Sequence, residues 1–481
     1  MRRLITIAAT IIAISACTPK ASVHSEQQPD IFPDYKDVTV PSNIAPLGFS
    51  LSGDSRPQYA VLESSGIRQK VRTKSGLLML SESKWHKLLS KGGEIKVTVT
   101  AKEDAGWTEY APFTITVAEP IDPYVTYRLI EPGYEIWYEM GIYQRNLESF
   151  RQTAVIENNM TDNGCVNCHS FNSYDPSQML FHARVGYNGT YMVRNGEVEK
   201  LNTKTDETLS ALVYPQWHPS GKYVAFSTNL TKQMFHTTDP NRVEVFDLNS
   251  DVVIYDVESH EIFSSPQLKS DGVFETFPTF SPDGKSLYFC SADSLKMPDS
   301  FESVRYSLCR VSFDPETATI GTDVDTLVNA RETGRSVSFP RMSPVSDKLM
   351  FTLSDYGNFS IWHQESDLYM LDLKSGEYES MDALNSDSVD SYHTWSSNGR
   401  WVIFSSRRMD RLYTRLFIAH IDENGNASKA FVIPQKQKGY YTSLMKSYNI
   451  PELTKGKVEL DKYELHKVAR DSKGTNLKFR H

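Results

Sequence analysis

The fold of this chain is decided by the stretch Tyr214-Pro215-Gln216-Trp217-His218-Pro219-Ser220-Gly221-Lys222-Tyr223-Val224-Ala225-Phe226. An apolar strand runs into a Pro-x-Gly turn, and a second strand follows in which apolar and polar residues alternate. Further copies start at residues 277, 339 and 392, and the copy at 339 has Ser346 in the glycine position. This spacing is typical of repeats that each form one propeller blade.

Turn signals after the copies predict further hairpins, so each repeat supplies four short antiparallel strands. These motifs resemble the TolB-like, or WD40-like PD40, propeller family over roughly residues 165–425. We therefore predict an all-β protein with a six-bladed TolB-like β-propeller. Residues 439–448 are expected to return to the first blade and close the ring, because an open ring leaves unpaired edges. The expected blades are 121–160, 168–202, 214–262, 277–320, 339–380 and 392–432.

Two further segments flank the predicted propeller, which spans residues 121–450. Residues 36–119 are expected to form a small β-sandwich-like domain, and an immunoglobulin-like arrangement is the simplest one. Strands are predicted there at 94–100 and 113–117, with a short helix at 84–89. Residues 451–481 are rich in lysine and lack a large apolar cluster, so we expect a solvated, polar and basic tail.

The first 17 residues are expected to direct export. Met1-Arg2-Arg3 is basic, and the apolar residues 4–14 are too few to span a bilayer. Ile14-Ser15-Ala16-Cys17 then resembles a bacterial lipobox, which implies cleavage before Cys17 and lipidation of its thiol. The alternative is a plain secretory signal with a chance cysteine. With residues 18–35 as a tether, the resemblance implies a lipid anchor in the bacterial cell envelope, on the periplasmic side or at the cell surface.

The composition narrows the classes of function. The net charge is −9 with both signs mixed along the chain, so nucleic acid is not an expected partner. The chain carries no Gly-x-Ser-x-Gly nucleophile motif and no phosphate-binding loop. We therefore expect an electron carrier or a binding protein with a protein partner rather than an enzyme.

The motif Cys165-Val166-Asn167-Cys168-His169 carries the candidate chemistry. Cys-x-x-Cys-His is the attachment sequence of a c-type haem: both thiols add to the haem vinyl groups and His169 becomes the proximal iron ligand. One alternative is a local disulfide between Cys165 and Cys168. Another is half of a zinc site, but no second Cys-x-x-Cys or His-x₃-His accompanies it.

A second resemblance concerns the setting of this motif. Residues 121–128 and 165–171 are similar to segments of a bacterial group of exported propeller lipoproteins that carry Cys-Val-Asn-Cys-His-Ser-Phe. That resemblance implies haem c, and haem ligation in the group is itself inferred from the motif. In the repeat alignment His169 takes the position of Pro215, Pro278 and Pro340, which predicts a haem at the mouth of the propeller channel.

The same alignment position is His393 in the last repeat, which makes His393 a candidate sixth iron ligand. The alternative is a strand residue whose ring is satisfied by a hydrogen bond. The rival ligands are Met160, Met179, His182 and Met342. Cys290 and Cys309 occupy neighbouring strand patterns, and they are expected either to form a disulfide or to stay a reduced buried pair.

Together these features predict a membrane-anchored lipoprotein that carries one haem c and serves in electron transfer or redox sensing. The alternative from another class is a non-redox propeller scaffold that binds a protein or a glycan, with Cys165 and Cys168 joined in a disulfide.

Overall fold

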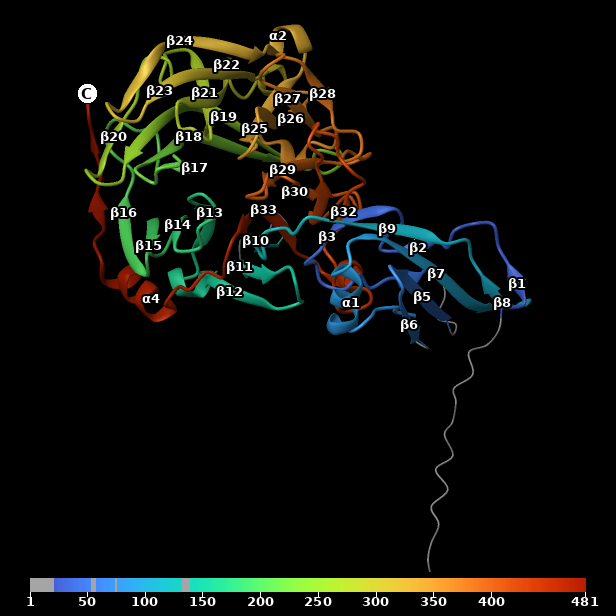
Figure 1. The fold of residues 1–481 in the computed structure, drawn as a ribbon. Helices are drawn as coiled ribbons and strands as arrows, with labels where there is room; N and C mark the ends of the chain where they lie inside the picture. Colours follow the sequence, from blue (N-terminus) through green and yellow to red (C-terminus); the bar gives the residue numbers. More distant parts are fainter. Residues whose placement is uncertain (1–20, 53–57, 74–75, 132–138) are drawn as a thin grey trace, which may run out of the picture.

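The computed structural model describes residues 21–52, 58–73, 76–131 and 139–481, so Cys17 and the expected signal peptide lie outside the described residues. Figure 1 shows sheets arranged around a central axis, with the N-terminal β domain at one side of this ring. Within the described ranges, no helix combines the length and the apolar character that crossing a membrane requires. The chain is all-β with a propeller-like arrangement.

The N-terminal domain is built on a seven-stranded sheet with the order β1-β8-β7-β5-β6, in which β9 pairs with both β7 and β3. β7 and β9 cover the two predicted strands, and α1 begins two residues before the predicted helix. The expected tether over residues 18–35 is wrong for its described part, because β1 and β2 pair with β8 and β4, and Ile31 and Tyr35 are buried in the core. The immunoglobulin-like topology stays a prediction. The elements are β1 (Val23–His24), β2 (Ile31–Phe32), β3 (Val38–Pro41), β4 (Ser50–Leu51), β5 (Gln58–Ser64), β6 (Ile67–Thr73), α1 (Glu82–Leu89), β7 (Gly93–Glu103), β8 (Gly106–Glu109) and β9 (Phe113–Ala118).

Four sheets of the ring consist mainly of antiparallel chain neighbours. Their orders are β12-β11-β10-β33, β13-β14-β15-β16-β34, β25-β26-β27-β28 and β29-β30-β31-β32. The strands are β10 (Tyr124–Ile130), β11 (Gly141–Asn146), β12 (Gln152–Glu157), β13 (Cys165–Phe171), β14 (Gln178–Arg184), β15 (Gly189–Arg194), β16 (Glu197–Asn202), β25 (Ser336–Met342), β26 (Lys348–Ser354), β27 (Asp367–Asp372), β28 (Tyr378–Ser380), β29 (Asp390–Trp395), β30 (Trp401–Ser406), β31 (Arg415–His420) and β32 (Phe431–Val432).

The strand pairing does not separate the remaining strands into the blades that the repeats predicted. β17 to β24 join β35 in one nine-stranded sheet. The reason is the length of the β18–β19 hairpin, which lets Ser250 of β19 pair with Phe274 of β21. The strands are β17 (Val213–Trp217), β18 (Tyr223–Phe235), β19 (Val243–Asp256), β20 (Glu261–Phe263), β21 (Val273–Phe280), β22 (Ser286–Asp293), β23 (Ser307–Asp314) and β24 (Thr319–Val328).

The C-terminal segment is part of the ring, and the expectation of a solvated tail over residues 451–481 is wrong. β33 (Ser447–Thr454) pairs with β10, so the closing strand lies later than the expected 439–448. α4 (Lys462–Asp471) buries Leu465 and Ala469, which lie on one face because they are four residues apart. β34 (Thr475–Asn476) and β35 (Lys478–Phe479) pair with β16 and β20.

A single apolar core joins the N-terminal domain to the ring. It includes Trp85 of α1 and Trp401 of β30, both almost fully buried. Trp401 donates from Nε1 to the carbonyl of Glu119 at 3.1 Å. Asp122 accepts from the backbone N–H of Ser397 at 2.6 Å and from its hydroxyl at 2.7 Å. The two parts are therefore packed and hydrogen-bonded together.

Candidate functional site

The Cys-x-x-Cys-His motif occupies β13, the first strand of its sheet. The pairing of β13 with β14 shifts register between Asn167 and Ser170. Cys168 lies within this interruption and has a left-handed backbone, with a φ of 51°. A bulge of this kind breaks the regular alternation of side chains along a strand. It re-aims the Cys168 side chain, which lines a cavity at the centre of the ring.

The same left-handed bulge recurs on the equivalent strands of the other repeats. This conformation is uncommon for residues other than glycine, asparagine and aspartate, so its recurrence belongs to the repeat itself. We call these residues the bulge layer. They are Cys168 (φ 51°), Tyr214 (52°), Phe277 (49°), Phe339 (54°), Tyr392 (50°) and Ile450 (42°).

Aromatic rings fill most of the bulge layer. The ring centroids of Tyr214 and Phe277 are 4.5 Å apart, those of Phe277 and Phe339 are 5.8 Å apart, and those of Phe339 and Tyr392 are 4.9 Å apart. Cys168 is the small member of the layer, so the packing is least complete on its side. The layer divides the centre of the ring into two cavities, because each bulged strand contributes different residues above and below it.

The larger cavity measures about 930 Å³ and is lined by Cys165, Cys168 and His169; we call it the motif cavity. Its volume lies within the range of small-molecule and cofactor sites. The structure thus brings all three chemically reactive residues of the motif to one cavity. Further lining residues are Arg128, His182, Arg184, Tyr214, Trp362 and Arg407.

His169 is held in a state suited to coordination. The residue is 3% exposed, and its Nε2 has no hydrogen-bond partner. Burial lowers the pKa of His169 to about 4, and a hydrogen bond with the backbone of Thr126 opposes this shift in part. At neutral pH the ring is therefore uncharged. Metal-binding histidines usually have one nitrogen free for the metal and the other fixed by a carbonyl or carboxylate.

Both thiols of the motif are free. Cys165 is buried, and the side-chain amide of Asn167 donates to its Sγ at 3.5 Å. Burial raises the pKa of the Cys165 thiol, while Arg128 and Arg184 lower it. The local disulfide considered for this pair is not formed in the structure.

Cationic side chains surround the motif. Arg407 is 5% exposed and lies over the ring of Trp362, with its guanidinium carbon 3.6 Å from the ring centroid. It donates to the carbonyls of Ile361 and Leu412. Burial lowers the pKa of Arg407 to about 9, which leaves it charged at neutral pH. Because Arg128 and Arg184 line the same cavity, the site favours an anionic group.

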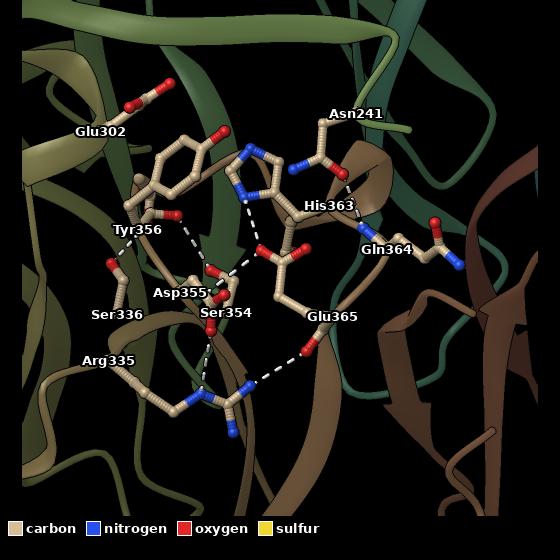
Figure 2. Close-up of polar contacts among 12 residues, drawn as sticks. Asn241, Glu302, Arg335, Ser336, Ser354, Asp355, Tyr356, His363, Gln364 and Glu365 are labelled. Atoms are coloured by element: carbon tan, nitrogen blue, oxygen red, sulfur yellow. Dashed lines mark hydrogen bonds and ion pairs between the residues drawn. The ribbon is translucent and has the colours of Figure 1, made fainter. Parts of the chain in front are cut away.

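One wall of the motif cavity comes from the long β18–β19 hairpin, which sequence reasoning did not predict. Glu244 on β19 accepts from the Tyr356 hydroxyl at 2.6 Å, and its Oε2 lies 3.0 Å from Nε2 of His363. Figure 2 shows His363 against the Tyr356 ring, with Glu365 beside its other nitrogen at 3.5 Å. We call Glu244, Tyr356 and His363 the hairpin latch.

The hairpin latch joins two walls of the motif cavity. Leu230 and Val245 line it from the hairpin, while Phe359 and Trp362 line it from the segment around η3 (Ser360–Trp362). Within this segment the backbone N–H of Gln364 donates to the side chain of Asn241 at 2.9 Å, as Figure 2 shows. The sequence held no clear signal for the outer half of this hairpin, because residues 230–235 of β18 are mostly exposed and do not alternate between apolar and polar.

The structure does not bring His393 to the motif cavity. Its Nε2 lies 2.9 Å from the carbonyl of Met350, and its ring packs against Phe339. This is the hydrogen-bonded strand residue that was the alternative to a sixth ligand. Among the rivals, His182 lines the motif cavity, where its Nδ1 lies 3.1 Å from the hydroxyl of Thr190.

The three methionine rivals lie elsewhere. Met179 is fully buried in an apolar cluster, and Met160 packs against the same cluster. Met342 lines the second, smaller cavity.

Of the two outcomes expected for Cys290 and Cys309, a disulfide or a reduced buried pair, the structure shows two reduced, buried thiols. In the pairing of β22 with β23, Cys290 is opposite Leu308 and Cys309 is opposite Phe289. Because side chains alternate between the two faces of a sheet, this offset of one residue places the thiols on opposite faces. They belong to different apolar clusters and both are free. The outcome is a pair of separate buried thiols.

No group of three or more histidine, cysteine, aspartate or glutamate side chains in the described part of the chain is arranged to hold a metal ion. The two thiols and the imidazole of the motif therefore do not converge on one point. Haem attachment makes no such demand, because only the imidazole binds the iron while the thiols bind the haem periphery.

Comparisons with known proteins return weak structural likenesses. Neither protein-family models nor curated proteins gave a match to this chain. An oligogalacturonate lyase from Vibrio parahaemolyticus has a TM-score of 0.35 and 12% identity, covering 63% of this chain and 92% of that one. The β-propeller domain of the trilobed protease from Pyrococcus furiosus has a TM-score of 0.33 and 14% identity, covering 68% and 92%.

A further similar structure is the dipeptidyl peptidase 4 of Porphyromonas gingivalis, with a TM-score of 0.30 and 10% identity over 71% of this chain and 58% of that chain. At these scores the likenesses carry no argument about function. The propeller-like fold rests on the strand pairing of this chain.

Proposed function

We propose that this chain is a membrane-anchored, exported propeller lipoprotein that binds one covalent c-type haem in the motif cavity and serves in electron transfer or redox sensing. One observation carries the proposal: Cys165, Cys168 and His169 line the same cavity, and the buried Nε2 of His169 has no partner. A buried polar atom without a partner costs about 1–3 kcal/mol, so its retention calls for an explanation.

Each residue of the motif has a separate role in this proposal. The free thiols of Cys165 and Cys168 would hold the haem by thioether bonds, and His169 would be the proximal ligand. When bound, the haem would supply reversible one-electron chemistry at its iron.

The cations at the cavity suit the carboxylates at the haem edge. Arg128, Arg184 and Arg407 all line the motif cavity. Charge-assisted hydrogen bonds from arginine to carboxylate are stronger than neutral ones and fix orientation. Arg407 is also held in place by Trp362, which reduces the entropy lost when a ligand binds.

We also infer that the ring has six blades. The support is a closed cycle of contacts between first strands, in the order β13, β17, β21, β25, β29, β33 and back to β13. Each of these six strands carries one residue of the bulge layer. In this view the nine-stranded sheet is two blades that the long β18–β19 hairpin links.

Anchoring at Cys17 remains part of the proposal because the lipobox-like segment precedes the described residues. The protein would be held by lipid in the bacterial cell envelope and would exchange electrons with a protein partner.

The experiment is expression of the full chain in cells with a cytochrome c maturation system. We expect a Soret band and a haem stain that survives denaturing electrophoresis, with one haem per chain. The double variant Cys165→Ser/Cys168→Ser is expected to lose the covalent stain. The matched control Cys290→Ser/Cys309→Ser should keep it, because these thiols lie in two other clusters.

Two results would count against the proposal. Colourless wild-type protein from haem-competent cells would favour the non-redox scaffold. Equal staining of both double variants would show that the haem is attached elsewhere.

In loaded protein, His393→Ala should leave the absorption spectrum unchanged, because His393 bonds the Met350 carbonyl.

A further inference from the structure

A second cavity of about 330 Å³ lies on the other side of the bulge layer; we call it the far cavity. It is built by the repeat, because each bulged strand contributes the residue two places after its bulge-layer residue. These residues are Ser170, Gln216, Thr279, Arg341, Thr394 and Glu452. All six are polar, and only Arg341 and Glu452 are charged.

Arg341 and Glu452 face the same cavity without forming an ion pair with each other. Arg341 stacks on Phe339, with its guanidinium carbon 3.9 Å from the ring centroid, and donates to the carbonyl of Pro340 at 2.8 Å. Glu452 accepts from the backbone N–H of Phe171 at 2.9 Å through Oε2. Both side chains line the cavity, and among the described residues each makes only the one hydrogen bond given above.

Burial disfavours the charged form of both side chains. Burial lowers the pKa of Arg341 to about 10, and Glu452 opposes this shift. Burial raises the pKa of Glu452 to about 8, and Arg341 opposes that shift, so in the empty cavity the Glu452 carboxyl is mostly protonated at pH 7. Each group thus senses the other across the cavity, yet each still carries a net cost of desolvation.

We propose that the far cavity binds a small zwitterion of the α-amino-acid class, with its carboxylate on Arg341 and its ammonium group on Glu452. A guanidinium matches a carboxylate with two parallel hydrogen bonds, and a carboxylate accepts from an ammonium group. The ammonium group of a zwitterion favours the ionised form of Glu452 while its carboxylate pairs with Arg341, so one ligand gives both groups a partner, whereas an anion or a cation gives a partner to only one of them. The volume is at the lower end of the range for ligand sites, which restricts the ligand to a small molecule.

The walls of the far cavity suit an apolar side chain on this ligand. Trp217, Phe280 and Trp395 line it next to the polar residues. The two tryptophans are fixed, because Trp217 donates to the carbonyl of Ser170 at 3.3 Å and Trp395 donates to the carbonyl of Arg341 at 3.2 Å. Rigid aromatic walls bury apolar groups of a ligand at little entropic cost.

The test is isothermal titration calorimetry on the Cys165→Ser/Cys168→Ser protein, which separates this site from haem binding. The ligands are L-leucine, 4-methylpentanoate, which lacks the amine, and 3-methylbutylamine, which lacks the carboxylate. We expect saturable binding of L-leucine and binding at least about tenfold weaker for each analogue, since every 1.4 kcal/mol is tenfold. Equal binding of leucine and either analogue, or no heat with leucine at millimolar concentration, overturns the proposal.

Variants supply a second arm. Arg341→Gln and Glu452→Gln are each expected to weaken leucine binding by at least about tenfold. Lys455→Gln is the matched control, because Lys455 is an exposed cation at the rim of the same cavity. If only Lys455→Gln lowers the affinity for leucine, the ligand binds at the rim, and the assignment to Arg341 and Glu452 is overturned. If Arg341→Gln or Glu452→Gln fails to fold, the comparison of leucine with its two analogues on the Cys165→Ser/Cys168→Ser protein still tests the proposal.

Discussion

At the scale of the residue, one position determines what the centre of this propeller contains. The bulge layer is aromatic at Tyr214, Phe277, Phe339 and Tyr392, but it is a thiol at Cys168. A left-handed residue costs backbone energy in every repeat, so the repeat keeps it for the side-chain direction that it provides. The exchange of a ring for a thiol both leaves room for the motif cavity and places a reactive group in it.

His393 carries a pH prediction at the same scale. Burial lowers its pKa from 6.5 to about 3. Below pH 6.5 the unfolded chain gains a proton that the folded chain does not, so stability falls as pH falls from 6.5 toward 3. The loss is at most about 1.4 kcal/mol per pH unit for this group. Thermal melting of His393→Gln between pH 7 and 4 should show a shallower fall than wild type.

His24→Gln is the control for this measurement, because the His24 side chain is 74% exposed. If the melting temperature of His393→Gln falls with decreasing pH as steeply as that of the wild type, the prediction is contradicted. Burial also lowers the pKa of His182, to about 3. Part of the fall in stability with falling pH should therefore remain in the His393→Gln variant.

At the scale of the element, the β18–β19 hairpin does more than complete a sheet. Its outer half forms one wall of the motif cavity, and the hairpin latch ties it to the segment around η3. The latch is buried: the side chains of His363 and Glu244 are 2% and 3% exposed. Breaking a buried polar pair leaves its partners unpaired, whereas breaking an exposed pair changes little.

Glu244→Ala is therefore expected to lower the free energy of unfolding by about 3–5 kcal/mol. The matched control is Asp347→Ala, which removes the exposed pair with Lys374 (2.9 Å) and should cost less than about 1 kcal/mol. Urea unfolding followed by tryptophan fluorescence measures both. Similar losses in the two variants would mean that the latch does not hold the hairpin.

The elements also show which predictions the sequence could support. Strand pairs with a Pro-x-Gly turn follow from local patterning, and so does the common position of His169 and Pro215. The latch could not be predicted, because Glu244 and His363 are far apart in sequence and meet only in the fold. The prediction of a solvated tail was wrong for a related reason. The segment has few apolar residues, but Leu465 and Ala469 lie on one face of α4, and both are buried.

Strand register decides between the two outcomes expected for Cys290 and Cys309, and it excludes the disulfide. Cys290 and Cys309 do lie on neighbouring strands, as predicted, but a shift of one residue decides which face each thiol takes. Register depends on the loop between the strands and on burial of both faces, and neither can be read from the two strand patterns alone. The zwitterion site was hidden in the same way, since Arg341 and Glu452 come from separate strands of the ring.

At the scale of the whole molecule, the N-terminal domain and the ring share one core. Trp85 and Trp401 belong to the same buried cluster, and Trp401 donates to the carbonyl of Glu119 across the junction. Lys429 adds an ion pair with Asp34 at 2.8 Å. An interface with a continuous apolar core couples the unfolding of its two sides.

We therefore expect a single endotherm for the full chain in differential scanning calorimetry. Asp122→Ala should move this endotherm to lower temperature without splitting it, because the apolar core remains. Two well-separated transitions in the wild-type protein would show that the domains unfold independently.

The closure of the ring by β33 has a consequence for the order of events during synthesis. β10 is made early and its partner β33 is made near the end of the chain, so the ring stays open until residues 447–454 have emerged. Ser447, Asn449 and Ile450 are part of the motif cavity wall. In a nascent chain Cys165 and Cys168 are therefore accessible before that wall exists, and under the proposed function haem attachment would precede closure of the ring.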